Sequence, residues 1–103
     1  MPRFTTRIEL HKKFGRTVTQ DDYNILHQEM LREKFLRTIE SDDGKYQLLE
    51  AEYNKIENGI TLDDVLQSAK RACEIVKLKS QNVADYSILI TEGTRKWYNL
   101  TKV

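Results

Sequence analysis

Two tetrapeptides constrain the fold of this chain more than any other feature: TQDD at residues 19–22 and TLDD at 61–64. In each, a threonine stands three residues before an aspartate, the spacing of a capping box at the first turn of a helix. Apolar residues at spacings of three and four follow each tetrapeptide, as on one face of a helix. The sequence therefore predicts two amphipathic helices, at about residues 20–34 and 62–78.

The segment before the first helix has the pattern of a strand. Between residues 3 and 11, apolar or small side chains alternate with polar ones, which is the period of a half-buried strand. The polar face of this strand carries Thr5, Arg7, Glu9 and His11. Further strands are predicted at 35–41, 45–57 and 86–92, and the sequence SDDGK predicts a hairpin turn between the second and third strands.

The predicted order is β-α-β-β-α-β. Two right-handed crossovers and a central hairpin give a ferredoxin-like α+β sandwich, with an antiparallel four-stranded sheet and both helices on one face. The final segment, RKWYNLTKV, is expected to add a short edge strand or a docked tail. The other sheet face is expected to be polar and open to solvent, a ligand or a second copy. A length of 103 residues suits a single domain over residues 1–103.

Composition excludes several classes of protein. The net charge is only +1, so any RNA contact needs a local basic patch, and no DNA partner is predicted. A single cysteine cannot form an intrachain disulfide and favours a reducing compartment. No segment approaches the ~20 apolar residues of a membrane helix, and the N-terminal sequence has no apolar region typical of a signal peptide. We expect a cytoplasmic protein without a membrane partner.

Metal sites and covalent catalysis have little support in the sequence. One cysteine and two histidines, at positions 11 and 27, offer no metal-ligand spacing. The acidic pairs at 21–22, 42–43 and 63–64 are accounted for by helix starts and a turn. Cys73 lies on the apolar stripe of the second helix and is expected to be a packing residue. No metal and no cofactor are therefore predicted.

General acid–base chemistry is the stronger hypothesis for a site. A histidine titrates near neutrality, and metal-free RNA cleavage needs a base for the 2′-hydroxyl and cations that stabilise the phosphorane. The alternative is a solvated sheet face without a reaction. The candidate catalytic residues are His11, Arg7 and Glu9, and the candidate phosphate-binding residues beside them are Lys12, Lys13 and Arg16.

The C-terminal segment offers a second candidate RNA contact. Arg95 and Lys96 are followed by Trp97 and Tyr98, and cations next to aromatic rings can bind phosphates and stack on bases. The alternative is that the two aromatic residues anchor the tail on the core while the two cations stay in solvent. Both interpretations remain open from the sequence.

Several stretches together resemble a bacterial family of small proteins. They are RFTTRIELH (3–11), FLRTI (35–39), YQLLEAEY (46–53), AKRA (69–72), ILITEG (88–93) and RKW (95–97). This family is grouped with GhoS, the endoribonuclease antitoxin of a type V toxin–antitoxin system. The resemblance implies a ferredoxin-like fold similar to that of CRISPR-associated small endoribonucleases, and cleavage of the messenger RNA for a membrane-lytic toxin peptide. Those CRISPR enzymes carry a metal-binding aspartate near the end of the first strand, where this chain has Glu9-Leu10-His11.

Two functional hypotheses follow. The first is a GhoS-like protein that binds single-stranded RNA or mRNA, with endoribonuclease activity, and works as a homodimer through a sheet face or an edge strand. The second is a non-catalytic module for protein interaction or dimerisation, which the near-neutral charge favours.

Overall fold

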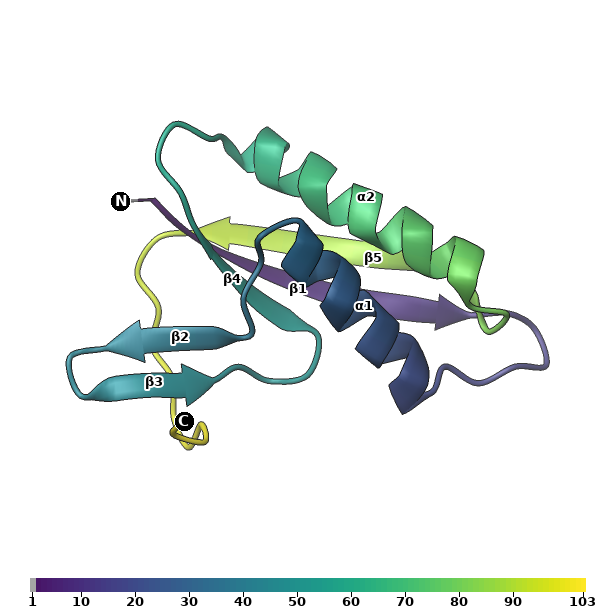
Figure 1. Cartoon of the computed structure of the whole chain (residues 1–103), viewed down its shortest axis with the longest axis horizontal. Helices are drawn as coiled ribbons and strands as arrows, with labels where there is room; N and C mark the ends of the chain where they lie inside the picture. The colour runs from purple at the N-terminus through teal and green to yellow at the C-terminus, as the bar shows by residue number, and fades with distance from the viewer. Residues whose placement is uncertain (1) are drawn as a thin grey trace.

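The computed structural model of the protein describes residues 2–103 (Figure 1). Met1, part of the predicted domain, lies outside the described residues. The chain is an α+β fold with two helices and five strands in the described part. The elements are β1 (Arg3–Lys12), α1 (Gln20–Arg32), β2 (Thr38–Ser41), β3 (Gly44–Gln47), β4 (Glu52–Ile56), α2 (Leu62–Lys79) and β5 (Val83–Glu92).

Both predicted helix starts are confirmed. The Thr19 hydroxyl accepts a hydrogen bond from the Asp22 backbone N–H, and the Asp22 carboxylate accepts one from the Thr19 N–H at 2.8 Å. Thr61 and Asp64 form the same reciprocal pair at the start of α2. Each box satisfies two backbone donors that have no partner inside the helix. Local sequence therefore decides where both helices begin.

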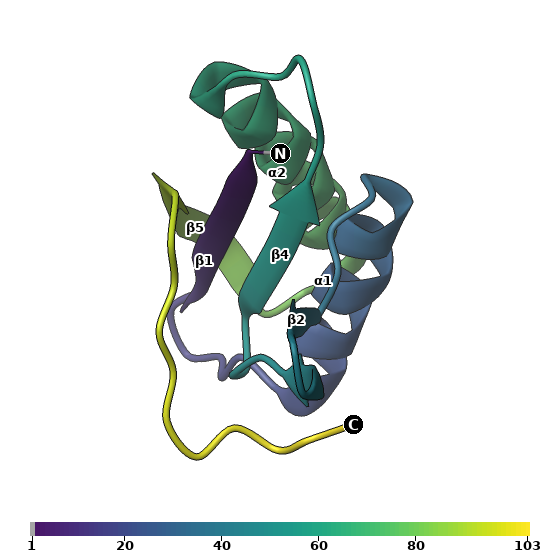
Figure 2. The same cartoon turned by 90° about the vertical axis from the view of Figure 1, so that its left-hand side faces the viewer.

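The main sheet has three antiparallel strands in the order β4-β1-β5, and both helices cover one of its faces (Figure 2). The alternation predicted for β1 is confirmed, because Phe4, Ile8 and Leu10 are buried while Arg7 and Glu9 are exposed. We call the side that carries Arg7 and Glu9 the open face. It is polar because the helices cover only the opposite side.

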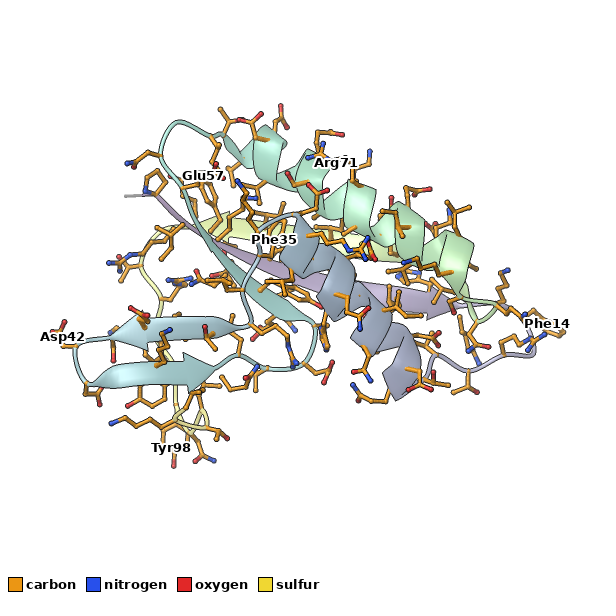
Figure 3. The ribbon with its side chains drawn as sticks, in the orientation of Figure 1. Phe14, Phe35, Asp42, Glu57, Arg71 and Tyr98 are labelled. Atoms are coloured by element: carbon orange, nitrogen blue, oxygen red, sulfur yellow. The ribbon has the colours of Figure 1, made fainter. Side chains whose placement is uncertain are left out.

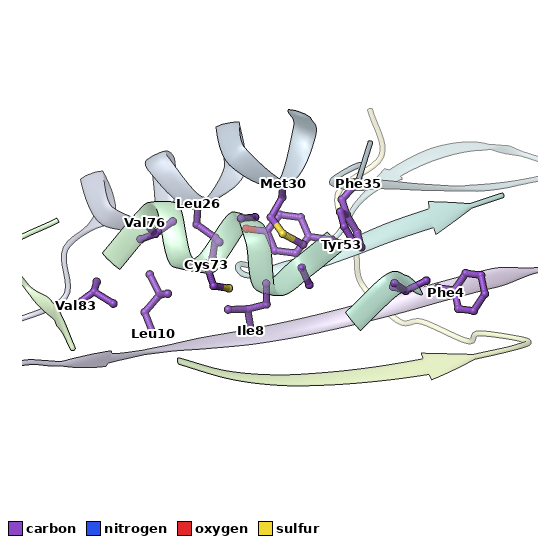
Figure 4. Close-up of a cluster of buried hydrophobic side chains, with 13 residues drawn as sticks. Phe4, Ile8, Leu10, Leu26, Met30, Phe35, Tyr53, Cys73, Val76 and Val83 are labelled. Atoms are coloured by element: carbon purple, nitrogen blue, oxygen red, sulfur yellow. The ribbon is translucent and has the colours of Figure 1, made fainter. Parts of the chain in front are cut away.

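The hydrophobic core lies between the helices and the sheet (Figure 4). Residues of β1 meet Leu26 and Met30 of α1, and α2 contributes a stripe of small and branched side chains. Cys73 belongs to this stripe and is fully buried, as the sequence predicted. Burial raises the pKa of the Cys73 thiol to about 12, so the reactive thiolate form is disfavoured at neutral pH.

The prediction of a single four-stranded sheet is wrong, because the segment predicted as one strand at 45–57 is divided. β3 and β4 are separated by a turn that includes Ala51 with a φ of 62°. The Ala51 carbonyl in this turn accepts a hydrogen bond from the Ile8 N–H of β1 at 3.0 Å. β2 and β3 therefore form their own two-stranded sheet, and a single bridge between Leu36 and Asn54 joins the preceding segment to β4.

The hairpin turn predicted at SDDGK is confirmed, since Ser41 pairs with Gly44 across it. A Cβ at Gly44 would lie 2.7 Å from the Lys102 Cε, so the C-terminal tail passes close to this turn. The tail docks on the hairpin: the Gln47 N–H donates to the Thr101 carbonyl and the Val103 N–H donates to the Lys45 carbonyl, both at 2.8 Å. The tail thus extends the small sheet by one bridge and adds no strand to the main sheet.

Candidate functional site

The open face of the main sheet holds the candidate catalytic residues. Arg7, Glu9 and His11 occupy alternate positions of β1 and all point to this face. Their side chains are accessible, with exposed fractions of 67% for Arg7 and 43% for His11. The structure therefore places the three side chains where a ligand could reach them.

Neighbouring strands supply partners for these side chains. The register sets Arg7 opposite Glu52, and the Arg7 Nε lies 3.3 Å from a Glu52 carboxylate oxygen. His11 lies across from β5, where its Nε2 is 2.9 Å from the Ser87 hydroxyl, and it is 3.7 Å from a Glu9 carboxylate oxygen. The charges of the open face are therefore largely balanced among its own residues.

Arg7 and His11 do not converge on one point. They are four residues apart on an extended strand, which separates their Cα atoms by about 13 Å. Their side chains also turn to different partners, Glu52 and Ser87. A hollow of about 500 Å³ lies beside Arg7 and Glu9, and its lining also includes Tyr23 and Glu50. This hollow combines one cation with two carboxylates, a poor match for a single phosphate group.

The candidate phosphate-binding residues lie together at the last residue of β1 and in the loop that follows it. We call residues 12–16 the tip loop; they form a tight turn in which the Arg16 N–H donates to the Lys13 carbonyl at 3.0 Å. No carboxylate within residues 2–103 lies at salt-bridge distance from Lys12, Lys13 or Arg16. Phe14 is fully exposed between them and points away from the molecule (Figure 3). The tip loop thus presents three cations and one aromatic ring without internal partners.

The tail residues have mainly structural contacts. The Arg95 guanidinium donates to the Asn54 side-chain carbonyl and, at 3.4 Å, to the Thr5 hydroxyl. Its burial lowers the pKa of Arg95, yet an arginine remains charged at physiological pH. The Trp97 ring packs on Tyr46 with 5.6 Å between centroids. The anchoring interpretation is confirmed only in part: Trp97 packs on the hairpin and Lys96 is exposed, but Tyr98 is 92% exposed and Arg95, expected in solvent, is half-buried. The contacts of Arg95 place the tail at the end of β1 opposite to the tip loop.

The structure shows one polar cluster that the sequence did not reveal. His27 is only 11% exposed; its Nδ1 lies 2.6 Å from the Tyr53 hydroxyl and its Nε2 lies 2.6 Å from a Glu50 carboxylate oxygen. Burial and the nearby Arg37 lower the pKa of His27, although Glu50 opposes this effect. A neutral ring with its proton on Nε2 donates to Glu50 and accepts from Tyr53. Tyr53 is buried, so this cluster ties α1 to β4 and offers no accessible nucleophile.

Searches for a metal centre or a membrane span were negative within residues 2–103. No group of three or more His, Cys, Asp or Glu side chains there could hold a metal ion. No helix of that part of the chain has the length and hydrophobicity needed to span a bilayer.

Comparisons with known proteins gave no relative for this chain. No protein-family model, no curated protein and no solved structure matches it.

Proposed function

We propose that this protein binds single-stranded RNA through its tip loop. The observation that carries the proposal is that Lys12, Lys13 and Arg16 form no salt bridge within residues 2–103, while the Phe14 ring is exposed among them. Cations in this arrangement can bind backbone phosphates, and an exposed ring can stack on an unpaired base. The tip loop offers a short basic patch of the kind that a near-neutral protein needs for such binding.

Endonucleolytic cleavage is the extension that the GhoS resemblance suggests. His11 directly precedes the tip loop and is the histidine on the open face, so it is the group that could accept a 2′-hydroxyl proton from bound RNA. Arg7 and Glu9 would act farther along the strand. The CRISPR-associated enzymes named in the resemblance bind metal through an aspartate that this strand lacks, so we propose a metal-free route.

The architecture that would accompany this function is a ferredoxin-like sandwich with a reduced fourth strand. Two reciprocal backbone hydrogen bonds between Leu36 and Asn54, at 2.8 and 2.6 Å, support this proposal. They set the segment before β2 beside β4, in the position that the outer strand has in that fold. In this interpretation the segment at Leu36 is a very short fourth strand, and the hairpin β2–β3 extends beyond it.

The test is binding of a fluorescent single-stranded RNA pool, followed by anisotropy as a function of salt. Lys12→Asn/Lys13→Asn should weaken binding and reduce the salt slope by about 1 to 1.5, because each phosphate contact on a single strand contributes ~0.7. The matched control is Lys34→Asn/Lys70→Asn, which removes the same charge from another part of the surface. An equal loss of RNA affinity in both variants would show that the tip loop is not a specific binding site.

Cleavage is tested separately, with the same RNA pool incubated in EDTA and in Mg²⁺. Product that forms in EDTA and disappears in His11→Ala supports metal-free chemistry at His11. Cleavage that needs Mg²⁺ contradicts the metal-free route and moves attention to Glu9. Binding without cleavage in either condition would support RNA binding and contradict the proposed endonuclease activity.

A second candidate function, a protein-interaction module, is favoured by one specific observation. β5 is an edge strand of the main sheet, and its Leu89 side chain is 58% exposed. A partner could bind at this edge whether or not the tip loop binds RNA.

A further inference from the structure

The outer edge of β5 lacks the devices that usually protect an edge strand. Natural edges are commonly blocked by charges, prolines, bulges or a covering segment. Residues 86–91, YSILIT, contain no charge and no proline, and the one irregularity in the β1–β5 register lies at the far end, between His11 and Lys12. Asp85 protects only the start of the edge, where its carboxylate accepts a hydrogen bond from the Tyr86 N–H at 2.9 Å.

Backbone hydrogen-bonding groups in the middle of β5 point outward. The Ile8 N–H of β1 donates to Ala51, on the side away from β5, while the Gly93 N–H donates to the Arg3 carbonyl. In an antiparallel ladder, residues that face each other alternate between bonded and non-bonded pairs. Ile8 and its opposite residue Ile88 therefore form a non-bonded pair. The N–H and C=O groups of Ile88, and likewise of Ile90, point to the free edge.

An apolar groove runs along this edge. It has a volume of about 230 Å³ and is formed by Leu62 and Leu66 of α2 with Ile88, Leu89 and Ile90 of β5, next to Asp63. Leu89 is 58% exposed on the open face, and Leu62 is 46% exposed on the helix side. Apolar side chains thus flank the outward backbone groups above and below the sheet.

We propose that the occupant of this edge is a second copy of the chain, paired β5 to β5 in antiparallel orientation with the two-fold axis at Leu89. In this register each Leu89 faces the same residue of the second copy, and Ile88 faces the other copy's Ile90. The outward N–H and C=O groups of these isoleucines then pair reciprocally. The result is one continuous six-stranded sheet with all four helices on the same face.

Self-complementarity of the edge favours this register and a second copy as the occupant, because the apolar run Ile88-Leu89-Ile90 is symmetric about Leu89. With the axis at Leu89, Glu92 lies opposite Tyr86 of the second copy. Around Tyr86 the charges are already paired within one copy, since Lys77 lies 3.9 Å from a Glu74 carboxylate oxygen and the Tyr86 hydroxyl donates to Glu74. Registers centred on Ile88 or Ser87 would instead place the apolar Leu89 opposite Ser87 or Asp85.

Solution mass is the first test, and it requires no RNA. Sedimentation over a range of concentrations should show the 12.2 kDa chain converting to a species of twice that mass. Leu89→Lys sets two like charges on the axis and should weaken dimerisation at least tenfold. The control Leu78→Lys, at an exposed position of α2, should dimerise as the unmodified chain does. A monomer at every concentration, or equal dimerisation of both variants, would overturn the proposal.

Thiol cross-linking tests the register. A non-bonded antiparallel pair has Cα atoms about 4.5 Å apart, within the range of a disulfide, so Leu89→Cys should give an intermolecular disulfide under mild oxidation. Ser87→Cys should not, because the register separates the two copies of this residue by about four residues along the strands. The native Cys73 is fully buried and stays unreacted. A cross-link through Ser87→Cys but not Leu89→Cys would contradict the register. Dimerisation through β5 does not require RNA binding by the tip loop. If one of the two proposals is contradicted, the other is unaffected.

Discussion

The two edges of the main sheet are treated differently by the same chain. At the β4 edge, Leu36 pairs with Asn54, and the Asn54 amide donates to the Thr38 carbonyl at 3.1 Å. His27 of α1 adds a hydrogen bond to Tyr53. At the β5 edge, the corresponding backbone groups of the central residues face outward, with a shallow apolar groove beside them.

This difference indicates which parts of the molecule maintain the fold and which are available to a partner. The β4 edge is buried under segments that lie far away in the sequence, so changes there should reduce stability. One face of β5 packs against the core, while its outer edge has no partner strand. Substitutions at exposed positions of this edge should therefore alter association between copies and leave the free energy of unfolding nearly unchanged. The predictions below test this contrast, beginning with the largest expected effect.

Tyr53→Ala should produce the largest loss of stability. Tyr53 is 1% exposed, packs edge-on against Phe35 and holds the His27 ring. Removal of a buried aromatic side chain costs about 3–5 kcal/mol in the free energy of unfolding. Chemical denaturation measures this value, and Leu89→Ala at the other edge is the control. Similar losses in the two variants would show that the edges do not differ.

Asn54→Leu should cost less, about 1–3 kcal/mol. The substitution leaves the Thr38 carbonyl and the half-buried Arg95 guanidinium without their amide partner. Because Arg95 begins the tail, the tail should also become more sensitive to proteolysis. Gln28→Leu, at an exposed position of α1, is the control and should be close to neutral. An unchanged unfolding free energy for Asn54→Leu would mean that these hydrogen bonds do not hold the covered edge.

The His27 cluster should make stability depend on pH. Burial and Arg37 lower the pKa of His27 below its ordinary 6.5, so the unfolded chain binds more protons than the folded one as the pH falls past that value. The stabilising contribution is therefore full above about pH 6.5 and is lost as the pH falls through the folded pKa, with a slope of at most ~1.4 kcal/mol per pH unit.

His27→Gln should remove this dependence, measured as unfolding free energy between pH 7 and pH 5. His11→Gln retains the cluster at the covered edge and is the matched control. A further loss is expected in stronger acid, because hydrogen bonds from Ser80, Thr19 and Asn82 to the carboxylate outweigh the effect of burial and lower the pKa of Asp22. An unaltered slope in His27→Gln would contradict the role of this cluster.

The smallest effect is expected for Leu89→Lys, measured on the dilute monomer. An exposed position away from the core should change the unfolding free energy by no more than about 0.5 kcal/mol. A loss of several kcal/mol would show that Leu89 belongs to the core and would remove the contrast between the edges.

Local sequence signals predicted the elements that depend on neighbouring residues. The two capping boxes gave both helix starts, and the alternation of β1 gave its buried and polar faces. The division of 45–57 was missed because no glycine, proline or asparagine marks the turn at residues 48–51. Ala51 adopts a positive φ there while its carbonyl bonds to Ile8, a contact between residues far apart in sequence.

The candidate site was predictable only in part for the same reason. Accessibility of Arg7, Glu9 and His11 followed from the strand period. The partners of Arg7 and His11 could not be predicted, because strand register brings Glu52 next to Arg7 and Ser87 next to His11. The burial of Arg95 depends on Asn54, 41 residues earlier in the chain. No local pattern joins such pairs.

Hydrogen exchange at two protein concentrations tests the contrast between the edges most directly. The Asn54 amide should be protected at both concentrations, because the Leu36 carbonyl of the same chain accepts its hydrogen bond. The amides of Ile88 and Ile90 should exchange rapidly in dilute protein and become protected as the concentration rises and β5 pairs with a second copy. Rapid exchange of both isoleucine amides at every concentration, with no change in solution mass, would contradict the account.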